Sequence, residues 1–431
     1  MPSAQSTIAR PQIRQWSWAL AGQAAQVLGQ AGSFLLIAKA LPVSDMGFFI
    51  AATSLTSILS PFTGMGAANL LIKYVARNRT AFASLWANLI GTTLVSGCVL
   101  CLAAIPACWL FFSGAVPFYA IVLLVVADLM LWRWLYLVGL TLQGLGEIKR
   151  KSQMEILVVC VRLIAAMLLF ALPKSQHQVW SWLLIYFGAA LLAAGSCLAW
   201  SLRRWGRPSN LRLPALAELK EGLWFVASPS TQTINNDADK LLLARLASLS
   251  AAGIYGAAYR VISASFLPVQ ALLTLTYPRF FRHGGRGLRQ STRFAIRWLP
   301  LGLGYSIAVG ILLSASAPLI VRILGPGYAQ TATVIRQLSV LPMMKTFQYF
   351  LADALTGADY QTLRVGLQGT VALINVVLNL LWIPRLGWEG AVWATLLCDG
   401  GLALLLMAAV LVLRNRTGQG PRAIDSAVAL R

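Results

Sequence analysis

The sequence predicts an all-α integral membrane protein, with about twelve transmembrane helices in two pseudo-symmetric six-helix lobes around a central cavity. Of the 431 residues, 58% are apolar and only 11% are charged, whereas soluble domains carry about 25% charged residues. Apolar segments long enough to cross a bilayer recur along the whole chain. The first half of the sequence also aligns with the second half at a constant offset.

The apolar segments give the number of spans. A helix needs roughly 20 predominantly apolar residues to cross the hydrocarbon core of a bilayer. Such segments occupy residues 16–38, 46–72, 84–112, 116–142, 153–172, 179–202, 222–244, 252–277, 294–321, 329–355, 362–384 and 388–413. The connections between them are short, which leaves no room for a soluble catalytic domain. The basic N-terminal residues precede a glutamine-rich segment, so we expect no removable signal peptide.

The basic residues predict the orientation in the membrane. With both termini in the cytoplasm, 23 of the 35 lysines and arginines fall in cytoplasmic segments and five fall in external loops. This bias follows the positive-inside rule and predicts a multi-pass protein of the cell inner membrane with cytoplasmic termini. It also explains the net charge of +22 without nucleic-acid binding. All six cysteines fall within spans, and Cys98 and Cys101 lack the further ligands that zinc needs, so we expect no disulfide, metal or cofactor.

An internal duplication divides the spans into two halves. At an offset of 206 positions, residues 34–52 align with residues 240–258 without a gap, so that Gly47 meets Gly253. Because six spans separate the copies, the halves should be related by an axis along the membrane normal. The predicted parts are lobes at residues 1–202 and 222–413, a cytoplasmic linker at 203–221 and a cytoplasmic tail at 414–431.

Two predicted helices at duplicated positions carry polar stripes. The stripes are Gln23, Gln26 and Gln30 on the first helix and Ser228, Gln232, Asn235, Asn236 and Asp239 on the seventh. At 100° per residue, the second group spans an arc of about 100°. We expect both stripes to face the central cavity, and the alternative is that they only bond helices to one another. Lys240 falls about 100° off the stripe, and we expect it to reach a carboxylate of a neighbouring helix.

Several segments resemble one family of transporters. They are GQAAQVLGQAGSFLLIAKALPVSDMGFFIAATSL and LLIKYVAR in the first half, and NNDADKLLLARLASLSAAGIYGAAYRV, YPRFF, LGPGYAQTATVIRQLSVLP and PRLGWEGAVWATLL in the second. Over nearly the whole chain they resemble bacterial oligosaccharide flippases of the multidrug/oligosaccharidyl-lipid/polysaccharide (MOP) exporter superfamily. The resemblance implies a MATE-like fold and the movement of undecaprenyl-pyrophosphate-linked oligosaccharides for O-antigen, capsule or exopolysaccharide synthesis. It also implies the polysaccharide polymerase machinery as a further partner.

Such a substrate needs cations around its pyrophosphate, and acids in the same cavity could couple its movement to H⁺ or Na⁺. Charges within spans are rare and usually face a water-filled interior. The candidate contacts of the anionic head are Lys240, Arg260, Arg133 and Lys345, and the candidate ion-coupling residues are Asp239, Asp237 and Asp353. The alternative for each is a structural ion pair or a side chain that reaches the membrane interface.

The predicted function is therefore that of a flippase that works by alternating access. The main alternative is a cation-coupled multidrug exporter of the same superfamily, which should carry an acid on the first helix, where this chain has glutamines. The basic-glycine motif of major-facilitator carriers is missing from IKYVARNRTAFASL. We expect no enzyme, because the sequence has no Walker sequence, glycine-rich phosphate loop or HExxH motif.

Overall fold

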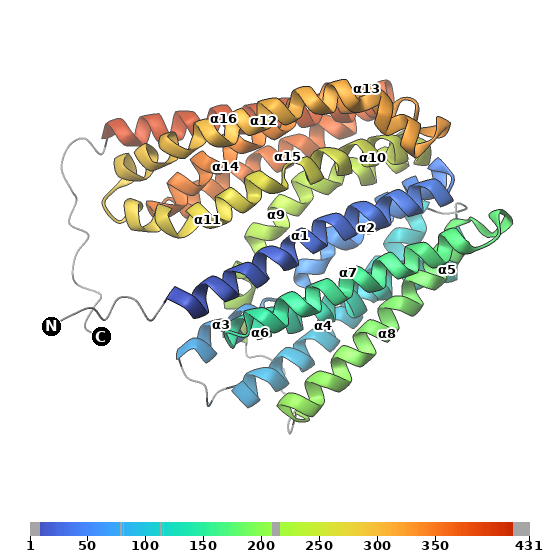
Figure 1. The fold of residues 1–431 in the computed structure, drawn as a ribbon, viewed down its shortest axis with the longest axis horizontal. Coiled ribbons are helices and arrows are strands. Elements are labelled where there is room, and N and C mark those ends of the chain that lie inside the picture. The colour runs from blue at the N-terminus through green and yellow to red at the C-terminus, as the bar shows by residue number, and fades with distance from the viewer. Residues whose placement is uncertain are drawn as a thin grey trace. The chain divides into compact units, whose positions relative to one another are not determined.

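The computed structural model describes residues 9–77, 80, 82–112, 114, 116–208 and 216–416, which form only helices and their connections (Figure 1). The α-helices are α1 (Ala9–Ala40), α2 (Val43–Leu59), α3 (Ala67–Arg77), α4 (Phe82–Phe112), α5 (Phe118–Val126), α6 (Arg133–Gly144), α7 (Ile148–Ala171), α8 (Val179–Trp205), α9 (Leu216–Leu246), α10 (Leu249–Ser265), α11 (Leu267–Gly284), α12 (Leu288–Leu324), α13 (Thr331–Leu338), α14 (Leu341–Gly357), α15 (Gln361–Leu386) and α16 (Trp388–Arg416). Short 3₁₀ turns and one π-helical segment, η3 (Ala127–Trp132), lie between them.

Each predicted span coincides with one helix or with two consecutive helices, which confirms the all-α membrane fold. Eight of these elements are long and apolar enough to cross a membrane, and a ninth is the pair Leu249–Ser265 and Leu267–Tyr277, bent by 45°. The other three predicted spans correspond to α1, α9 and the pair formed by α13 and α14. Glutamines on α1 and the asparagines, aspartates and lysine of α9 lower the hydropathy of two of these spans. The residues predicted to line a cavity are thus the ones that make their helices less apolar.

The second predicted span of each half is interrupted at the same place. In the first half, the 3₁₀ turn η1 (Ser60–Phe62) separates α2 from α3, and in the second half Phe266 separates α10 from α11. Positions 60 and 266 differ by the duplication offset of 206. Pro61 and Pro268 lie at the two breaks, where a missing backbone N–H favours the end of a helix. The duplication therefore includes the interruption as well as the sequence.

The helices form two compact units. Unit 1 comprises Met1–Ala257, Val321–Gln330 and Leu380–Trp388, and unit 2 comprises Ala258–Ile320, Thr331–Asn379 and Glu389–Arg431. Unit 1 contains α9 in addition to the helices of the predicted first lobe, because α2 and α3 both pack against α9. The predicted lobe boundaries stay a prediction, and residues 209–215 of the predicted linker and residues 417–431 of the predicted tail lie outside the described residues.

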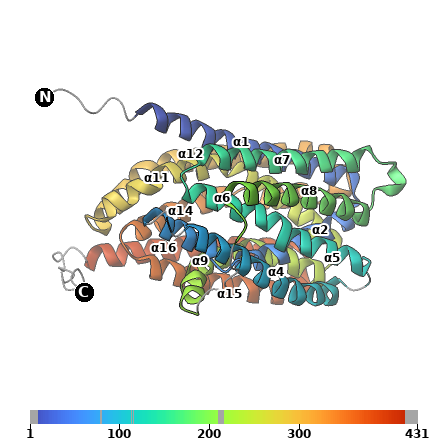
Figure 2. The same ribbon diagram turned by 90° about the horizontal axis from the view of Figure 1, so that it is seen from below.

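Within unit 1, α1 lies along α7 over much of its length (Figure 2). Glycines at a seven-residue spacing make this contact possible. A Cβ atom on Gly22 would lie 3.1 Å from the Cβ of Ser152, and one on Gly29 would lie 1.8 Å from Cγ1 of Val159. Small residues allow close approach of helices in membranes, where no hydrophobic effect drives helices together.

The two copies of the duplicated segment touch each other through a pair of glycines in unit 1. A Cβ atom on Gly47 of α2 would lie 1.7 Å from the carbonyl oxygen of Leu249, and one on Gly253 of α10 would lie 2.4 Å from the carbonyl oxygen of Val43. Residues 43 and 249 are also separated by the offset of 206. The contact is therefore reciprocal, as expected for equivalent residues that meet near a pseudo-two-fold axis.

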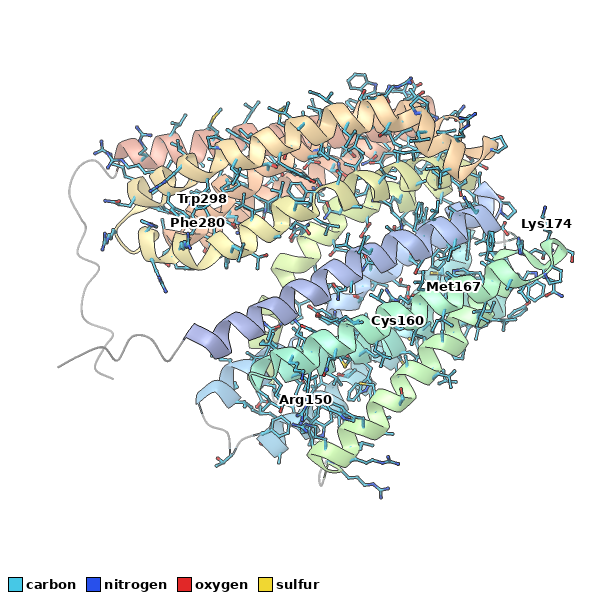
Figure 3. All side chains as sticks on the ribbon, viewed as in Figure 1. Arg150, Cys160, Met167, Lys174, Phe280 and Trp298 are labelled. Atoms are coloured by element: carbon cyan, nitrogen blue, oxygen red, sulfur yellow. The ribbon has the colours of Figure 1, made fainter. Side chains whose placement is uncertain are left out.

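Ion pairs connect two helices at one end of unit 1. Glu147 accepts hydrogen bonds from Arg150 at 2.6 Å and from Arg204 at 2.7 Å, and so connects the start of α7 to the end of α8. Partial burial disfavours the ionised form, but the two arginine contacts outweigh it and lower the pKa of Glu147. Arg150 lies at the start of α7 and Lys174 lies just beyond its end, with Cys160 and Met167 between them (Figure 3). The basic cluster around Arg150 is the end that we predict to face the cytoplasm.

Cysteine labelling tests this orientation. We expect Ser175→Cys and Ser248→Cys to react with a membrane-impermeant thiol reagent from outside, and Gly285→Cys and Thr362→Cys to react only after the membrane is opened. All four positions are exposed, so accessibility reports the side of the membrane. The parent chain is the control for its six native cysteines. Reaction at Gly285→Cys in intact cells would overturn the predicted orientation.

Candidate functional site

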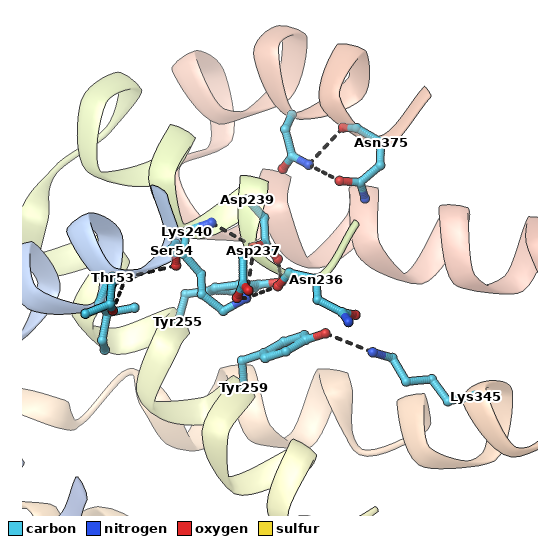
Figure 4. A network of polar contacts seen from close by, with 12 residues as sticks. Thr53, Ser54, Asn236, Asp237, Asp239, Lys240, Tyr255, Tyr259, Lys345 and Asn375 are labelled. Carbon is cyan, nitrogen blue, oxygen red and sulfur yellow. Dashed lines mark hydrogen bonds and ion pairs between the residues drawn. The ribbon is translucent and has the colours of Figure 1, made fainter. Parts of the chain in front are cut away.

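A buried charge cluster lies on α9 in unit 1 (Figure 4). The Lys240 ammonium lies 3.1 Å from Oδ1 of Asp239 and 3.3 Å from Oδ1 of Asp237, and it also donates to the carbonyl oxygen of Asn236. The side chain of Lys240 is 5% exposed and that of Asp239 is 1% exposed, whereas that of Asp237 is 27% exposed. Two carboxylates and one ammonium leave one negative charge, so a single bound proton or sodium ion would balance the cluster.

Asp239 also joins α9 to α10. The phenolic O–H of Tyr255 donates to Oδ2 of Asp239 at 2.5 Å, while Oδ1 accepts from Lys240. Both carboxylate oxygens therefore have a donor, which is what a carboxylate buried in a membrane protein needs. The two carboxylates that Lys240 contacts here lie on α9 itself and not on the neighbouring helix that we expected, because Asp239 directly precedes it and Asp237 is three residues earlier, where i and i+3 side chains are neighbours.

A cavity of about 380 Å³ opens beside this cluster in unit 1. Its lining residues come from the break between α2 and α3, from α6 and from α9, and they are Ser57, Ser60, Pro61, Gly66, Ala68, Asn69, Arg133, Tyr136, Leu137, Leu140, Val226, Thr233 and Asp237. The volume lies within the range of roughly 300–1,000 Å³ found for small-molecule sites. Hydroxyl, amide, carboxylate and guanidinium groups all face this one space, so it can bind a polar and charged group.

Arg133 is placed in the cavity by two local irregularities. It follows directly after the π-helical segment η3, and such segments often occur at functional sites. Its guanidinium donates to the carbonyl oxygens of Pro61 at 3.3 Å and Thr63 at 3.4 Å, which have lost helical partners where α2 ends. The guanidinium also lies 4.7 Å from the ring centre of Tyr136. No described carboxylate pairs with Arg133, so its positive charge is uncompensated inside the cavity.

The predicted site residues of unit 1 divide into two groups. Arg133 and Asp237 line the cavity together, although they lie on different helices more than 100 residues apart in the chain. Asn236 contributes its carbonyl oxygen to Lys240, and Oδ1 of Asn235 is buried without a hydrogen-bond partner among the described residues. Of the other predicted stripe positions, Gln26 is half-buried and Gln30 and Gln232 are exposed, and none of these three lines the cavity. The side chains of Gln23 and Ser228 lie outside the described residues.

Two predicted site residues of unit 2, Lys345 and Asp353, have partners within that unit. Lys345 donates to the hydroxyl of Tyr259 at 2.8 Å (Figure 4). Asp353 lies 3.4 Å from Arg364, which also donates to Thr356. Arg260 is exposed on α10. Asp353 therefore occupies an ion pair in this structure, and its role in ion coupling stays a prediction.

Sequence reasoning missed several residues of the site. Ser57, Ser60, Asn69 and Thr233 line the cavity through hydroxyl and amide groups. The proline and the two glycines in the segment SPFTGMGAAN (60–69) predict an interruption of the span from sequence alone. In the structure, Gly64, Met65 and Gly66 adopt positive φ there.

A second buried carboxylate lies elsewhere in unit 1. Asp128 accepts hydrogen bonds from Thr56 at 2.5 Å and from Tyr186 at 2.6 Å. These contacts explain the acid as a link between helices. Among the described residues no group of histidine, cysteine and acidic side chains is arranged to hold a metal ion.

Comparisons with known proteins agree with this fold. A family model described as "Polysaccharide biosynthesis protein" matches residues 13–283. An inward-facing multidrug resistance transporter of the MATE family and MOP superfamily is similar with a TM-score of 0.71 and 12% identity, over 93% of this chain and 99% of that chain. A MATE structure in complex with MaL6 gives a TM-score of 0.65 and 14% identity, over 94% and 96% of the two chains.

A third solved structure is a MOP superfamily transporter from Pyrococcus furiosus, described as having a binding pocket of reverse polarity. It is similar with a TM-score of 0.61 and 15% identity, over 93% of this chain and 96% of that chain. No curated protein matches the chain. The matched residues cover more than half of the sequence, and the chain therefore belongs to the polysaccharide biosynthesis protein family and has the MATE-like fold of MOP-superfamily transporters.

Proposed function

We propose that the protein is a flippase that moves polyprenyl-pyrophosphate-linked oligosaccharides across the inner membrane by alternating access. The observation that carries the proposal is the cavity of unit 1, where the unpaired charge of Arg133 shares one space with Ser57, Ser60, Asn69 and Thr233. A guanidinium suits a phosphate group, to which it can donate two parallel hydrogen bonds. The hydroxyl and amide groups suit a sugar. The family match to polysaccharide biosynthesis proteins supports the same substrate class.

A multidrug exporter is the second candidate, and one observation favours it. Asp237 lines the same cavity, and a carboxylate there could bind an organic cation. However, the ammonium of Lys240 lies 3.3 Å from Asp237, whereas Arg133 contacts only backbone carbonyls and an aromatic ring. The charges of Asp237, Asp239, Lys240 and Arg133 sum to zero, so a proton or sodium ion bound by the acids would leave one net positive charge, which favours an anion over a cation in the cavity.

Reconstitution distinguishes the two candidates. The purified protein is placed in liposomes with a fluorescent short-chain polyprenyl-pyrophosphate sugar, and the fraction protected from a membrane-impermeant quencher is followed with time. We expect loss of protection only in liposomes that contain the protein. Gradient-driven accumulation of a cationic dye such as ethidium, without movement of the lipid-linked sugar, would replace the proposal by the exporter.

Asp239 is proposed to bind the coupling ion. Asp239→Asn should abolish the response of transport to an imposed pH or sodium gradient, because the amide keeps the shape of the carboxylate and loses its charge. Substrate binding should change by less than about threefold, since Asp239 does not line the cavity. Tyr255→Phe is the matched control, because it removes the hydrogen bond to Oδ2 and leaves the charge in place. An unchanged gradient response in Asp239→Asn would contradict this role.

A further inference from the structure

The hairpin formed by α11 and the start of α12 in unit 2 carries a surface of exposed arginines. The members, called here the arginine surface, are Arg279, Arg282, Arg286, Arg289, Arg293 and Arg297, and all six are exposed. No aspartate or glutamate occurs between residues 240 and 352. None of the six forms a hydrogen bond or ion pair with any described residue. The surface therefore holds six positive charges that no carboxylate of the described part of the chain pairs with.

The opposite face of the hairpin is fixed by the core of unit 2. Phe280 is fully buried and packs with Phe294, and Trp298 lies against the same cluster (Figure 3). A Cβ atom on Gly284 would lie 1.9 Å from the carbonyl oxygen of Gly357, and Ser291 donates to the carbonyl oxygen of Ala354 at 2.9 Å. The hairpin cannot rotate without breaking these contacts, so the arginines are held on the outer face.

The charges are arranged along a line. Arg289, Arg293 and Arg297 follow one another at four-residue intervals on α12, which places them on one side of the helix about 6 Å apart. Like charges at this spacing destabilise a helix. Three other arginines near helix ends have acidic partners, because Arg150 and Arg204 pair with Glu147 and Arg364 pairs with Asp353. Single arginines at other helix ends, Arg245, Arg322 and Arg385, form no ion pair with a described residue, so the arginine surface differs from them in gathering six such charges on one hairpin. The arginine surface lacks such partners within the described chain, which indicates an external anion.

The surroundings of the arginines identify the kind of anion. Ile296 and Leu301 are 54% and 60% exposed between and beyond the arginines of α12, and Phe281 is 46% exposed on α11. The helix α12 then continues as a membrane span. A surface that mixes exposed apolar side chains with arginines at the end of a span fits lipid tails and headgroups together, and it does not fit a soluble polyanion.

We propose that the arginine surface is a docking site for anionic phospholipids, and in particular for a lipid that carries two phosphates, of the cardiolipin class. Guanidinium groups bind phosphate oxygens through paired hydrogen bonds. Two arginines one helical turn apart can each bind one phosphate of the same headgroup. Once the first phosphate is bound, the second is held close to its arginine at a high effective concentration, which strengthens binding of the whole lipid. The inference concerns resident lipid and does not depend on the transported substrate.

The test is lipid binding by the full-length protein in detergent, measured by native mass spectrometry with tetraoleoyl cardiolipin, dioleoyl phosphatidylglycerol or dioleoyl phosphatidylcholine. We expect the parent to bind cardiolipin more tightly than phosphatidylglycerol and to bind phosphatidylcholine least. The triple change Arg289→Gln, Arg293→Gln and Arg297→Gln should weaken cardiolipin binding by roughly 100-fold, since each basic residue near an anionic lipid surface contributes a factor of about five.

Two further variants keep the test specific. The triple change to lysine at the same positions keeps the charge and should retain most of the binding. The change Arg150→Gln, Lys151→Gln and Arg204→Gln removes three charges that have acidic partners, and it should alter cardiolipin binding by less than about threefold. Equal loss in this control and in the glutamine variant of the arginine surface would overturn the proposal. Binding of a short RNA as tight as that of cardiolipin would overturn it as well.

Discussion

Arg133→Gln is expected to weaken binding of a polyprenyl-pyrophosphate sugar by about 5- to 150-fold, and to abolish complementation of surface polysaccharide synthesis in cells. The range corresponds to a loss of about 1–3 kcal/mol for a hydrogen bond to a charged group. The expected cost exceeds the 0–1 kcal/mol of an exposed ion pair because the cavity excludes much of the bulk water. The same side chain supports the break between α2 and α3, so thermal unfolding of the variant must be measured beside its binding.

Two matched variants separate charge from structure at this position. Arg133→Lys keeps the charge and should lose less affinity than Arg133→Gln, but it should not equal the parent if the guanidinium binds phosphate through two nitrogens. Arg162→Gln removes an arginine that stacks on Trp132, with its guanidinium carbon 4.2 Å from the ring centre, and does not line the cavity. If Arg133→Gln binds the lipid-linked sugar as tightly as Arg162→Gln does, Arg133 is structural and the anion site is wrong.

Gly47→Ala and Gly253→Ala are expected to have the second large effect, the loss of transport together with a lower unfolding temperature. Each new methyl group would lie within 2.4 Å of a backbone carbonyl oxygen on the facing helix. Backbone atoms cannot move aside as a side chain can, so α2 and α10 must separate. Overpacking of this kind typically costs about 1–3 kcal/mol. The reciprocal geometry predicts that the two substitutions act alike.

Gly188→Ala and Gly366→Ala are the controls, because a Cβ atom at either helical position meets nothing within 4 Å. These changes should leave stability unchanged or raise it slightly, since alanine favours helix over glycine by about 1 kcal/mol. The measurements are thermal unfolding in detergent and complementation of polysaccharide synthesis. Normal transport by both Gly47→Ala and Gly253→Ala would show that the close contact between the copies is dispensable.

The sequence singled out the charged residues of the cluster on α9 but not their geometry, and their role in transport stays a prediction. The sequence marks Asp237, Asp239 and Lys240 as functional because charges in membrane spans are rare. It also contains the i and i+3 spacing of Asp237 and Lys240, at which side chains on a helix are neighbours. The partner of Asp239 is different, because Tyr255 lies on the next helix and only the turn between α9 and α10 brings its hydroxyl to the carboxylate.

The sequence by itself determined the membrane fold, the place of each span and the duplication. These properties depend on local composition, since every span must be apolar and must satisfy its own backbone hydrogen bonds in lipid. The offset of 206 likewise follows from aligning the sequence with itself, and this alignment pairs Gly47 with Gly253.

Only the tertiary structure decided which polar residues form a site. The cavity is built from residues 57–69, 133–140 and 226–237, which are far apart in the chain and meet because α2 and α3 pack against α9. The interrupted second span leaves carbonyl oxygens without helical partners, and Arg133 satisfies them from a different helix. Helical periodicity predicts the direction of a side chain around its own axis. It does not predict which neighbour lies in that direction, because this depends on packing of the whole unit.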